Sequence, residues 1–388
     1  MRALPLHRRF WWQQGQRWPR LVWLVMQIIL WLRWQLIHSV PAYYRALKRY
    51  GPTIAGEEGI SVRAQVRCLA RLGLCWCIHP IDAYRFRLYR DPTRALAYVY
   101  AAETAAFHDW RSEARTRGSA SKALLQDKTA LAQLLSHHGI PVVTTLASLP
   151  HRHELRPLSD LMGDVQQVFC KMNSGHMGIG AFAAWRTATG LAGQRLTGEA
   201  LADDAAVASA WQALCQLDQS LVQPLLQNHP ALAALSYDGT VIRVRVATEW
   251  THTYPSTDEA LKTLCAFMVI LAGHFKNQSP LNIVSPIEVE TGQLGPLLHP
   301  IVMNETYRQA HTRINQLMRP GYCLPYWSQL VAHSQQSHRL IPDIQSIAWD
   351  WVLTPSGPIL LEGNTAWGLT IPQQLTSGFL ARHQSSSP

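Results

Sequence analysis

Near the C-terminus the chain reads Trp349-Asp350-Trp351-Val352-Leu353-Thr354-Pro355-Ser356-Gly357-Pro358-Ile359-Leu360-Leu361-Glu362-Gly363-Asn364. Two apolar, strand-like runs flank a Ser-Gly-Pro turn sequence, so we expect a β-hairpin. Alternation along the first run directs Asp350 away from the tryptophans on either side of it, and the turn brings it close to Glu362 and Asn364. Such hard oxygen donors suit Mg²⁺, which often completes its shell with substrate phosphates. The hairpin therefore predicts a nucleotide site, although an edge hairpin whose acids face water would show the same pattern.

Composition limits the classes of protein that fit. A chain of 388 residues favours two or three domains. Hydrophobic residues make up 47% and charged residues 15%, against about 25% charged residues in ordinary globular chains. The net charge of +10 is concentrated in the first 100 residues, which hold 16 Lys and Arg against 4 Asp and Glu. This excess adjoins an apolar, tryptophan-rich segment and no RNA or DNA motif, so we expect no nucleic-acid partner.

Residues 19–40 predict a helix at a membrane surface. Leu21 to Leu32 is apolar except for Gln27 and is flanked by arginines, with tryptophans near both ends. A spanning helix needs about 20 apolar residues, and this run stops at Arg33. Tryptophan and arginine at its ends suit the headgroup layer of the inner face of a membrane. We expect a cytoplasmic protein that is peripheral on that face, and a core helix of the N-terminal region fits the same run.

The seven cysteines are scattered and form no C-x-x-C pair. Cys75-Trp76-Cys77-Ile78-His79 lacks a second ligand pair at zinc-site spacing. We therefore expect buried free thiols in a reducing cytosol and assign the cysteines no role.

The middle of the chain predicts a phosphate-binding flap. After a polar run that places a domain boundary near residue 116, an amphipathic helix from Lys122 to Gly139 carries Lys128. A strand at 165–172 contains Lys171 and leads into a loop with Gly175, Gly178 and Gly180, and a second strand follows. In Rossmann and P-loop folds a helix follows the loop instead. Glycine amides can approach phosphate oxygens and Lys171 adds positive charge, whereas a bare flexible hairpin is the alternative.

Two later strands complete the pattern. The short apolar strand Leu221-Val222-Gln223-Pro224-Leu225 can present Gln223 and Leu225 to a flat heterocycle, and Thr240 to Thr248 alternates strictly, so Arg243 and Arg245 share one face. Two adjacent guanidiniums favour an anion, although a solvated sheet face explains them as well. Mixed helices and strands without a regular βαβ rhythm predict an α+β fold with largely antiparallel sheets.

This ordered series resembles the ATP-grasp superfamily. Gln223 to Pro230, Arg245-Val246-Ala247-Thr248 and Leu361-Glu362-Gly363-Asn364 are more narrowly similar to the sugar-transfer-associated ATP-grasp family. The resemblance covers about residues 120 to 378. It implies an ATP-grasp fold, in which two α/β subdomains clamp ATP, after a mainly helical N-terminal region at 1–115. The ATP-grasp domain would span 116–388, with a small lid at 165–222 and a larger, metal-binding subdomain at 223–388.

The resemblance also implies roles for individual residues. Lys128 and Lys171 would hold the α and β phosphates, the three loop glycines would close over the triphosphate, and Gln223 with Leu225 would frame adenine. Asp350, Glu362 and Asn364 would bind Mg²⁺. Arg245, with Arg243 beside it as the second candidate catalytic residue, would steady the transferred phosphoryl group.

The expected activity is that of an ATP- and Mg²⁺-dependent carboxylate–amine ligase acting through an acyl phosphate. Polysaccharide or cell-envelope glycoconjugate biosynthesis is the context that the family implies, with a small-molecule or glycoconjugate substrate and glycosyltransferases as pathway partners. Two alternatives stay open. One is an ATP-grasp kinase acting on a sugar or small-molecule hydroxyl, and the other is a non-catalytic nucleotide-binding adaptor at the membrane.

Overall fold

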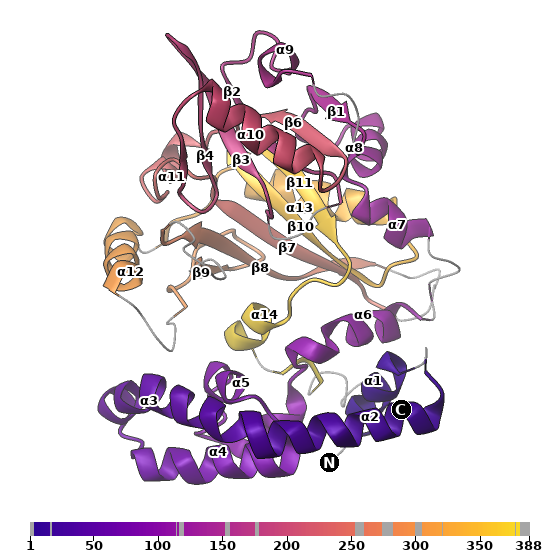
Figure 1. The fold of residues 1–388 in the computed structure, drawn as a ribbon, viewed down its shortest axis with the longest axis vertical. Helices are drawn as coiled ribbons and strands as arrows, with labels where there is room; N and C mark the ends of the chain where they lie inside the picture. The colour runs from indigo at the N-terminus through magenta and orange to yellow at the C-terminus, as the bar shows by residue number, and fades with distance from the viewer. Residues whose placement is uncertain are drawn as a thin grey trace. The chain divides into compact units, whose positions relative to one another are not determined.

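The computed structural model describes residues 4–15, 18–113, 115, 120–151, 156–174, 178–252, 260–273, 282–298, 305–319, 321–376 and 378–380 (Figure 1). The chain forms two compact units. Unit 1 comprises Met1–Glu113, Leu298–Asn304 and Ala366–Pro388, and unit 2 comprises Ala114–Leu297 and Glu305–Thr365. The expected ATP-grasp domain, 116–388, thus differs from unit 2 in its last residues, because 366–388 group with the N-terminal helices.

Unit 1 is helical in its described residues. Its elements are α1 (Leu4–Gln14), α2 (Arg20–Arg33), the π-helical turn η1 (Trp34–His38), α3 (Ser39–Glu58), α4 (Val62–Trp76), α5 (Pro80–Arg85), the 3₁₀ turns η2 (Pro92–Ala97) and η3 (Ala101–Glu103), α6 (Thr104–Ser112) and α14 (Thr370–Leu375). Helices α3 and α4 form a helical hairpin, and Ser61 is the N-cap of the second helix. Between them lies a buried cluster that includes Ile54, Leu69, Leu72 and Tyr84.

Helix α3 runs through Gly51-Pro52, where the composition of the sequence suggests a break. A proline inside a helix normally costs a hydrogen bond and a steric clash. Tertiary contacts hold this segment in place: the fully buried Gln65 of α4 donates to the backbone oxygens of Gly51 and Ile60 and accepts from the Tyr84 hydroxyl. A buried side chain from the neighbouring helix therefore overrides the local signal.

All seven cysteines are free thiols, as expected, but they are not all buried. Cys75, Cys77 and Cys323 are exposed. The expectation of buried thiols was wrong for these three, because the C-terminal turn of α4 and the segment around Cys323 lie at the surface.

Unit 2 contains two antiparallel sheets. The first has the strand order β1-β6-β2-β3-β4-β5 and the second β11-β10-β7-β8-β9. The strands are β1 (Ala147–Leu149), β2 (Gln167–Met172), β3 (Phe182–Thr187), β4 (Gly190–Arg195), β5 (Ala200–Leu201), β6 (Ser220–Pro224), β7 (Arg243–Trp250), β8 (Leu261–Leu271), β9 (Asn282–Ile287), β10 (Ser346–Thr354) and β11 (Gly357–Asn364). The helices are α7 (Ala120–Gln126), α8 (Lys128–His137), α9 (Leu158–Leu161), α10 (Asp204–Cys215), α11 (Pro230–Ala233), α12 (Glu305–Leu317) and α13 (Trp327–Arg339). The expected α+β fold with largely antiparallel sheets is confirmed.

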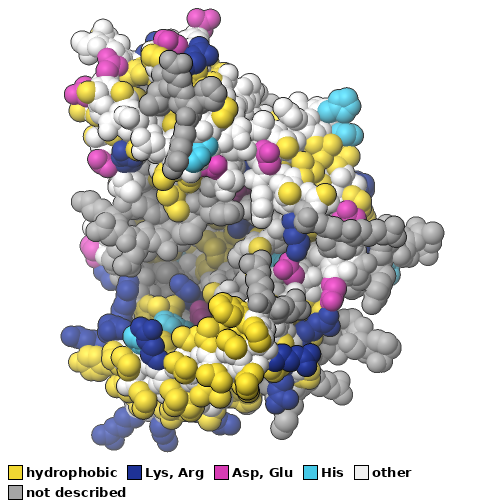
Figure 2. Space-filling model, turned by 45° about the vertical axis from the view of Figure 1, so that its right-hand side comes forward, with side chains coloured by type: hydrophobic (Ala, Val, Ile, Leu, Met, Phe, Trp, Pro, Cys, Tyr) yellow, Lys and Arg dark blue, Asp and Glu magenta, His cyan; other side chains and the backbone are white. Residues whose placement is uncertain are grey.

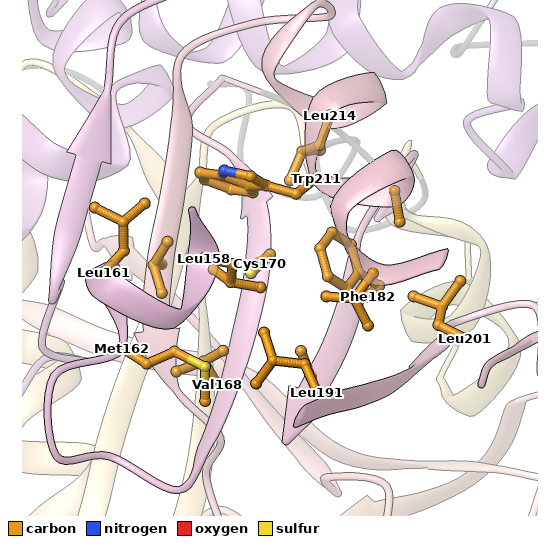
Figure 3. Close-up of a cluster of buried hydrophobic side chains, with 14 of the residues drawn as sticks. Leu158, Leu161, Met162, Val168, Cys170, Phe182, Leu191, Leu201, Trp211 and Leu214 are labelled. Carbon is orange, nitrogen blue, oxygen red and sulfur yellow. The ribbon is translucent and has the colours of Figure 1, made fainter. Parts of the chain in front are cut away.

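The six-stranded sheet buries one face under α9 and α10 (Figure 3). Val168 and Cys170 of β2 and Val222 of β6 point into this core, where they meet Trp211 and Leu214 of α10. Because side chains alternate along a strand, the residues between them project from the opposite face. That opposite face carries Lys171 and Gln223.

The five-stranded sheet packs one face against α13. Trp351 of β10 donates to the Ser334 hydroxyl of that helix (2.9 Å), and the Trp349 indole donates to Thr248 (2.9 Å), which also contacts the fully buried His338. Both tryptophans are fully buried. The other face of β10 is therefore left for Asp350, as the alternation predicts.

Candidate functional site

The hairpin of β10 and β11 places the three oxygen donors side by side. Asp350 lies directly opposite Glu362, and Ala348 lies opposite Asn364. The amide nitrogen of Asn364 is 3.4 Å from Glu362 Oε1. A β-bulge follows Asp350, and Thr354 pairs with Gly357 across the Pro355-Ser356 turn. The predicted hairpin is confirmed, and its register gathers the donors at one end of the strand pair.

Asp350 is bound by an arginine from the neighbouring strand. Arg245 of β7 lies opposite it and donates from Nε to Oδ1 (2.6 Å) and from a terminal nitrogen to Oδ2 (2.5 Å). Burial raises the pKa of the Asp350 carboxyl, but the charge and hydrogen bonds of Arg245 outweigh it, so the net pKa lies below the ordinary value. Asp350 is thus held as a carboxylate. Arg245 was expected at the phosphoryl group, and here it is hydrogen-bonded to Asp350, one of the predicted metal donors.

Arg243 lies two residues before Arg245 on the same strand face, as the alternation predicts. It is paired in register with Val352, and its charge adds to the lowering of the Asp350 pKa. Its side chain is only partly buried. Arg243 therefore supplies positive potential beside the Arg245–Asp350 pair.

Lys171 projects from the face of β2 that is opposite the sheet's core. Burial lowers the pKa of Lys171 to about 8, Glu362 acts in the opposite direction, and the positive charge of Lys128 adds to the lowering. These effects fall off with distance, so Lys171 shares its surroundings with both residues. The amine comes from one sheet and the carboxylate from the other.

Lys128 is the first residue of α8. Its ammonium donates to the backbone oxygen of Asn173 (2.8 Å) and lies 3.8 Å from Glu362 Oε2. Burial lowers the pKa of Lys128, while Glu362 raises it. The predicted single helix from 122 to 139 is broken just before this lysine, because Asp127 caps α8 by accepting from the backbone N–H groups of Thr129 and Ala130 (3.0 Å each).

Asn173 connects the start of α8 to the base of the glycine loop. Its amide nitrogen donates to Asp127 Oδ1 (3.0 Å) and to Gln219 (3.2 Å), and its amide oxygen accepts from the backbone and hydroxyl of Thr129 (3.1 and 3.2 Å). It is 5% exposed, so its polar groups are satisfied inside the protein. The sequence patterns assigned no role to Asn173 or Asp127. A short polar residue before an apolar helical run is a signal for a helix N-cap, and this signal could have identified Asp127.

The segment between α8 and β1 ties the two sheets together. The backbone of Val143 donates to Leu360 of β11, and Leu360 donates back to Pro141 (3.1 and 2.9 Å). This short parallel pairing precedes the first regular strand, which begins at Ala147. The chain thus runs along β11 before it joins the other sheet, which sets Lys128 beside Glu362.

A small pocket lies where α8 and the two sheets meet. Its polar lining comes from Lys128, Gln223 and Glu362, and its apolar lining includes Leu131, Val142 and Leu360. Gln223 is buried and donates to the Thr145 hydroxyl (3.3 Å). Leu225 follows β6, and its backbone N–H donates to the oxygen of Gln167 (3.0 Å).

The loop glycines occupy left-handed backbone conformations where they are described. Gly178 and Gly180 have φ of 68° and 72°, and Gly175 lies outside the described residues. A Cβ on Gly178 would come within 2.5 Å of Leu196, and one on Gly180 within 3.2 Å of Leu214 and Leu217. Both glycines are therefore required by backbone conformation and close packing, whatever ligand the loop meets.

A sequence model described as "Sugar-transfer associated ATP-grasp" matches residues 113–385, more than half of the chain. The chain belongs to the sugar-transfer-associated ATP-grasp family. The match begins where unit 2 begins and includes every site residue named above. Comparison with curated proteins gave no match.

Solved structures similar to this ATP-grasp chain include three enzymes. D-alanine–D-alanine ligase from Bacillus anthracis, complexed with ATP, has 11% identity, covers 68% of this chain and 66% of its own and gives a TM-score of 0.35. D-alanyl-alanine synthetase A from Vibrio cholerae O1 biovar eltor str. N16961 has 13% identity, 68% and 64% coverage and a TM-score of 0.39. An ADP complex of purK, N5-carboxyaminoimidazole ribonucleotide synthetase, has 12% identity, 66% and 48% coverage and a TM-score of 0.36. The chain spans less than two thirds of each, and likenesses at this level carry no argument about substrate or reaction.

The donors of this ATP-grasp site fit a magnesium ion chemically. Two carboxylates and one amide oxygen are hard ligands, and each carboxylate oxygen of Asp350 keeps a lone pair beyond its bond to Arg245. Among the described residues there is no cluster of three or more His, Cys, Asp or Glu side chains. Three protein donors would leave positions in an octahedral shell for phosphate oxygens and water, as Mg²⁺ sites in nucleotide enzymes do.

Proposed function

We propose that this ATP-grasp protein is an ATP- and Mg²⁺-dependent ligase that joins a carboxylate to an amine. The observation that carries the proposal is that the Lys128 ammonium lies 3.8 Å from Glu362, beside the Arg245–Asp350 pair, with Lys171 close enough for both charges to act on its pKa. Ammonium groups and hard oxygen donors meet at the junction of two sheets. This combination suits a metal-bound triphosphate, because the lysines attract phosphate oxygens and the carboxylates attract the metal.

The reaction needs positioning and charge neutralisation more than a protein nucleophile. A substrate carboxylate oxygen forms a bond to the γ-phosphorus, and the bond to the bridging oxygen of ADP breaks. The nitrogen of the amine then forms a bond to the acyl carbon, inorganic phosphate leaves, and the amine loses a proton to solvent or buffer. The product is an amide.

Each residue has a defined part in this proposal. Lys128 and Lys171 bind the phosphates near the sugar, and Gln223 orients the base in the adjoining pocket. Asp350, Glu362 and Asn364 hold the metal, which supplies charge neutralisation at the phosphates when bound. Arg245 keeps Asp350 ionised and in place, and Arg243 offers a partly exposed guanidinium to an anionic substrate group.

The family description motivates the biological context. We propose that the substrate is a small molecule or glycoconjugate of polysaccharide or cell-envelope biosynthesis, with glycosyltransferases as pathway partners. The protein would then act on the cytoplasmic side, where ATP is available.

Product analysis tests the reaction class. With γ-labelled ATP, carboxylate and amine pools, a ligase releases labelled inorganic phosphate only when both acceptor classes are present. A kinase instead leaves the label on a hydroxyl acceptor without any amine. Glu362→Gln should strongly lower either activity, so it serves as the low-activity control. The absence of Mg²⁺-dependent ATP turnover with every acceptor pool would contradict both enzymes and favour a nucleotide-binding adaptor.

A further inference from the structure

The surface of unit 1 exposes an unusual amount of apolar side chain. On α2, nine of the aliphatic and aromatic side chains are between 41% and 73% exposed, and on η1 Leu36 and Ile37 are 78% and 60% exposed. We name this surface the apolar face; its members on α2, η1 and the start of α3 are Leu21, Val22, Leu24, Val25, Ile28, Ile29, Leu30, Trp31, Leu32, Leu36, Ile37, Val40 and Tyr44. In Figure 2 hydrophobic side chains gather in one region of the surface, with Lys and Arg side chains around them.

The second helix of the hairpin extends the apolar face. Gln35 of η1 donates to the backbone oxygen of Gly73 (3.3 Å), so the C-terminal turn of α4 lies beside η1. Leu74 and Trp76 in that turn are 66% and 42% exposed. Tertiary packing, through this contact, adds the end of α4 to the apolar face.

The other side of the same helical stretch is packed against protein. Trp23 of α2 is buried beside Gly15 and Trp11, and Gln27 accepts a hydrogen bond from the Trp11 indole (3.3 Å). Farther along, Tyr43 of α3 donates to the oxygen of Ile78. Among the described residues, Arg20–Glu58 is the one helical stretch long and apolar enough, by length and composition, to cross a membrane. If this helix crossed a bilayer, it would lose these contacts with the rest of unit 1.

The charge around the apolar face is mostly positive. Residues 1–81 contain only two acidic side chains, Glu57 and Glu58, and Glu58 is bonded to Arg90 and Tyr89. Exposed basic side chains lie on both α3 and α4: Arg45, Lys48, Arg49, Arg63, Arg67 and Arg71. Apolar surface bordered by cations is complementary to a bilayer that carries anionic headgroups.

We infer that unit 1 is a platform that lies in the plane of an anionic lipid surface, with α2, η1 and the end of α4 immersed at the headgroup level. The apolar face supplies the buried area, the arginines and lysines meet the headgroups, and the packed side keeps the helix parallel to the surface instead of across it. The platform does not depend on the reaction catalysed in unit 2, so the two proposals can fail separately.

Vesicle flotation tests the platform. Full-length protein is mixed with preformed vesicles of phosphatidylcholine alone, or of phosphatidylcholine with phosphatidylglycerol, and separated on a density gradient. We expect flotation with the anionic vesicles and weaker flotation in high salt, because screening shortens the range of the charges. Equal flotation with both vesicle types, or flotation with neither, would overturn the inference.

Substitutions on the apolar face locate the contact. Ile28→Glu/Ile29→Glu on α2, and Leu36→Glu/Leu74→Glu on η1 and α4, should each lower binding to anionic vesicles at least about tenfold. All four residues are at least half exposed, so the fold should persist, which thermal unfolding can verify. The control Leu317→Glu changes a 43% exposed leucine of unit 2 and should float like the parent protein. Parent-like binding by both double variants would refute the platform.

Two further outcomes distinguish other occupants of the apolar face. Alkaline carbonate should release the bound protein, whereas retention in the vesicle fraction indicates a crossing helix and contradicts the in-plane arrangement. In sedimentation of the protein without vesicles, we expect no dimer that depends on the apolar face, that is, no dimer that the double variant Ile28→Glu/Ile29→Glu would dissociate. Such a dimer, in the absence of flotation, would assign the apolar face to a second copy of the chain.

Discussion

Arg245 and Asp350 face each other on adjacent strands and share two hydrogen bonds, with the carboxylate almost completely buried. Breaking a buried pair by removing one charge is costly, because the remaining charge loses both water and partner. The Asp350 carboxylate therefore stabilises the fold and is also a candidate metal donor. A substitution of Asp350 should for this reason lower stability more than a substitution of Glu362.

Asp350→Asn should destabilise unit 2 by about 3 to 5 kcal/mol, because it leaves the Arg245 guanidinium buried without its counter-charge. Urea unfolding followed by tryptophan fluorescence measures this change, since Trp349 and Trp351 flank the site. The matched variant Glu362→Gln, at a more exposed position, should cost much less. Equal losses of stability in the two variants would contradict the structural role of Asp350.

Glu362→Gln should lower ATP turnover about 100-fold and raise the Mg²⁺ concentration needed for half-maximal rate, because an amide oxygen carries no charge for the metal. A Mg²⁺ titration of initial rates measures both effects. If turnover falls while the Mg²⁺ dependence stays that of the parent, Glu362 acts on the lysines alone and is not a metal donor.

The affinity for ATP should depend on pH through Lys171. With a pKa of about 8 in the free protein, Lys171 carries its proton below that pH and loses it above. Because the phosphates bind the charged form, affinity should be highest below about pH 8 and should fall as the pH rises through this value. Calorimetric titration at a series of pH values measures the fall.

Two variants assign this pH dependence to Lys171. Lys171→Arg keeps its charge throughout the range, so the fall near pH 8 should disappear. Glu362→Gln should move the fall to lower pH, since the Glu362 carboxylate raises the pKa of Lys171. An unchanged profile in Lys171→Arg would assign the titration to another group.

Asn173→Asp should raise the KM for ATP about tenfold or more, because it sets a second carboxylate against Asp127 and displaces the start of α8, where Lys128 lies. Asn173→Ala should act in the same direction by leaving the Asp127 and Gln219 side chains without their partner. The neighbouring substitution Ser174→Ala, at an exposed position, is the control and should leave KM near the parent value. Steady-state kinetics with a measured kcat distinguish this positioning effect from a general loss of active protein.

Gly363→Ala should destabilise unit 2 by about 1 to 3 kcal/mol. An added Cβ would come within 2.6 Å of the Trp349 ring and 2.9 Å of Leu125, and neither can move freely inside the protein. Thermal unfolding measures the loss, and Gly368→Ala, where no atom lies within 4 Å and φ is not positive, is the steric control. Parent-like stability of Gly363→Ala would show that the ring can shift.

The sequence predicted the elements that depend on local patterns. Alternation along 346–354 and 240–248 indicated the strands that carry Asp350 and Arg245, and the Ser-Gly-Pro turn indicated the hairpin that joins the strand of Asp350 to that of Glu362. The same reasoning failed at Asp127, which splits one predicted helix into two, and at Gly51-Pro52, which does not end α3. At Asp127 the cap is local, since Asp127 accepts from the N–H groups of Thr129 and Ala130, whereas at Gly51 the distant side chain of Gln65 supplies the deciding hydrogen bond.

What the sequence by itself determined about this protein is the identity and order of its candidate ligands and the strands that bear them, because strand alternation and turn chemistry act between near neighbours. Only the tertiary structure decided that Arg245 holds Asp350, that Asn173 fixes the helix bearing Lys128, and that Lys128 lies beside Glu362, whose charge also acts on Lys171. The physical reason is that these contacts join residues 45 to 234 positions apart, and they form only when strand registers and the crossing between the sheets are set by packing of the whole unit.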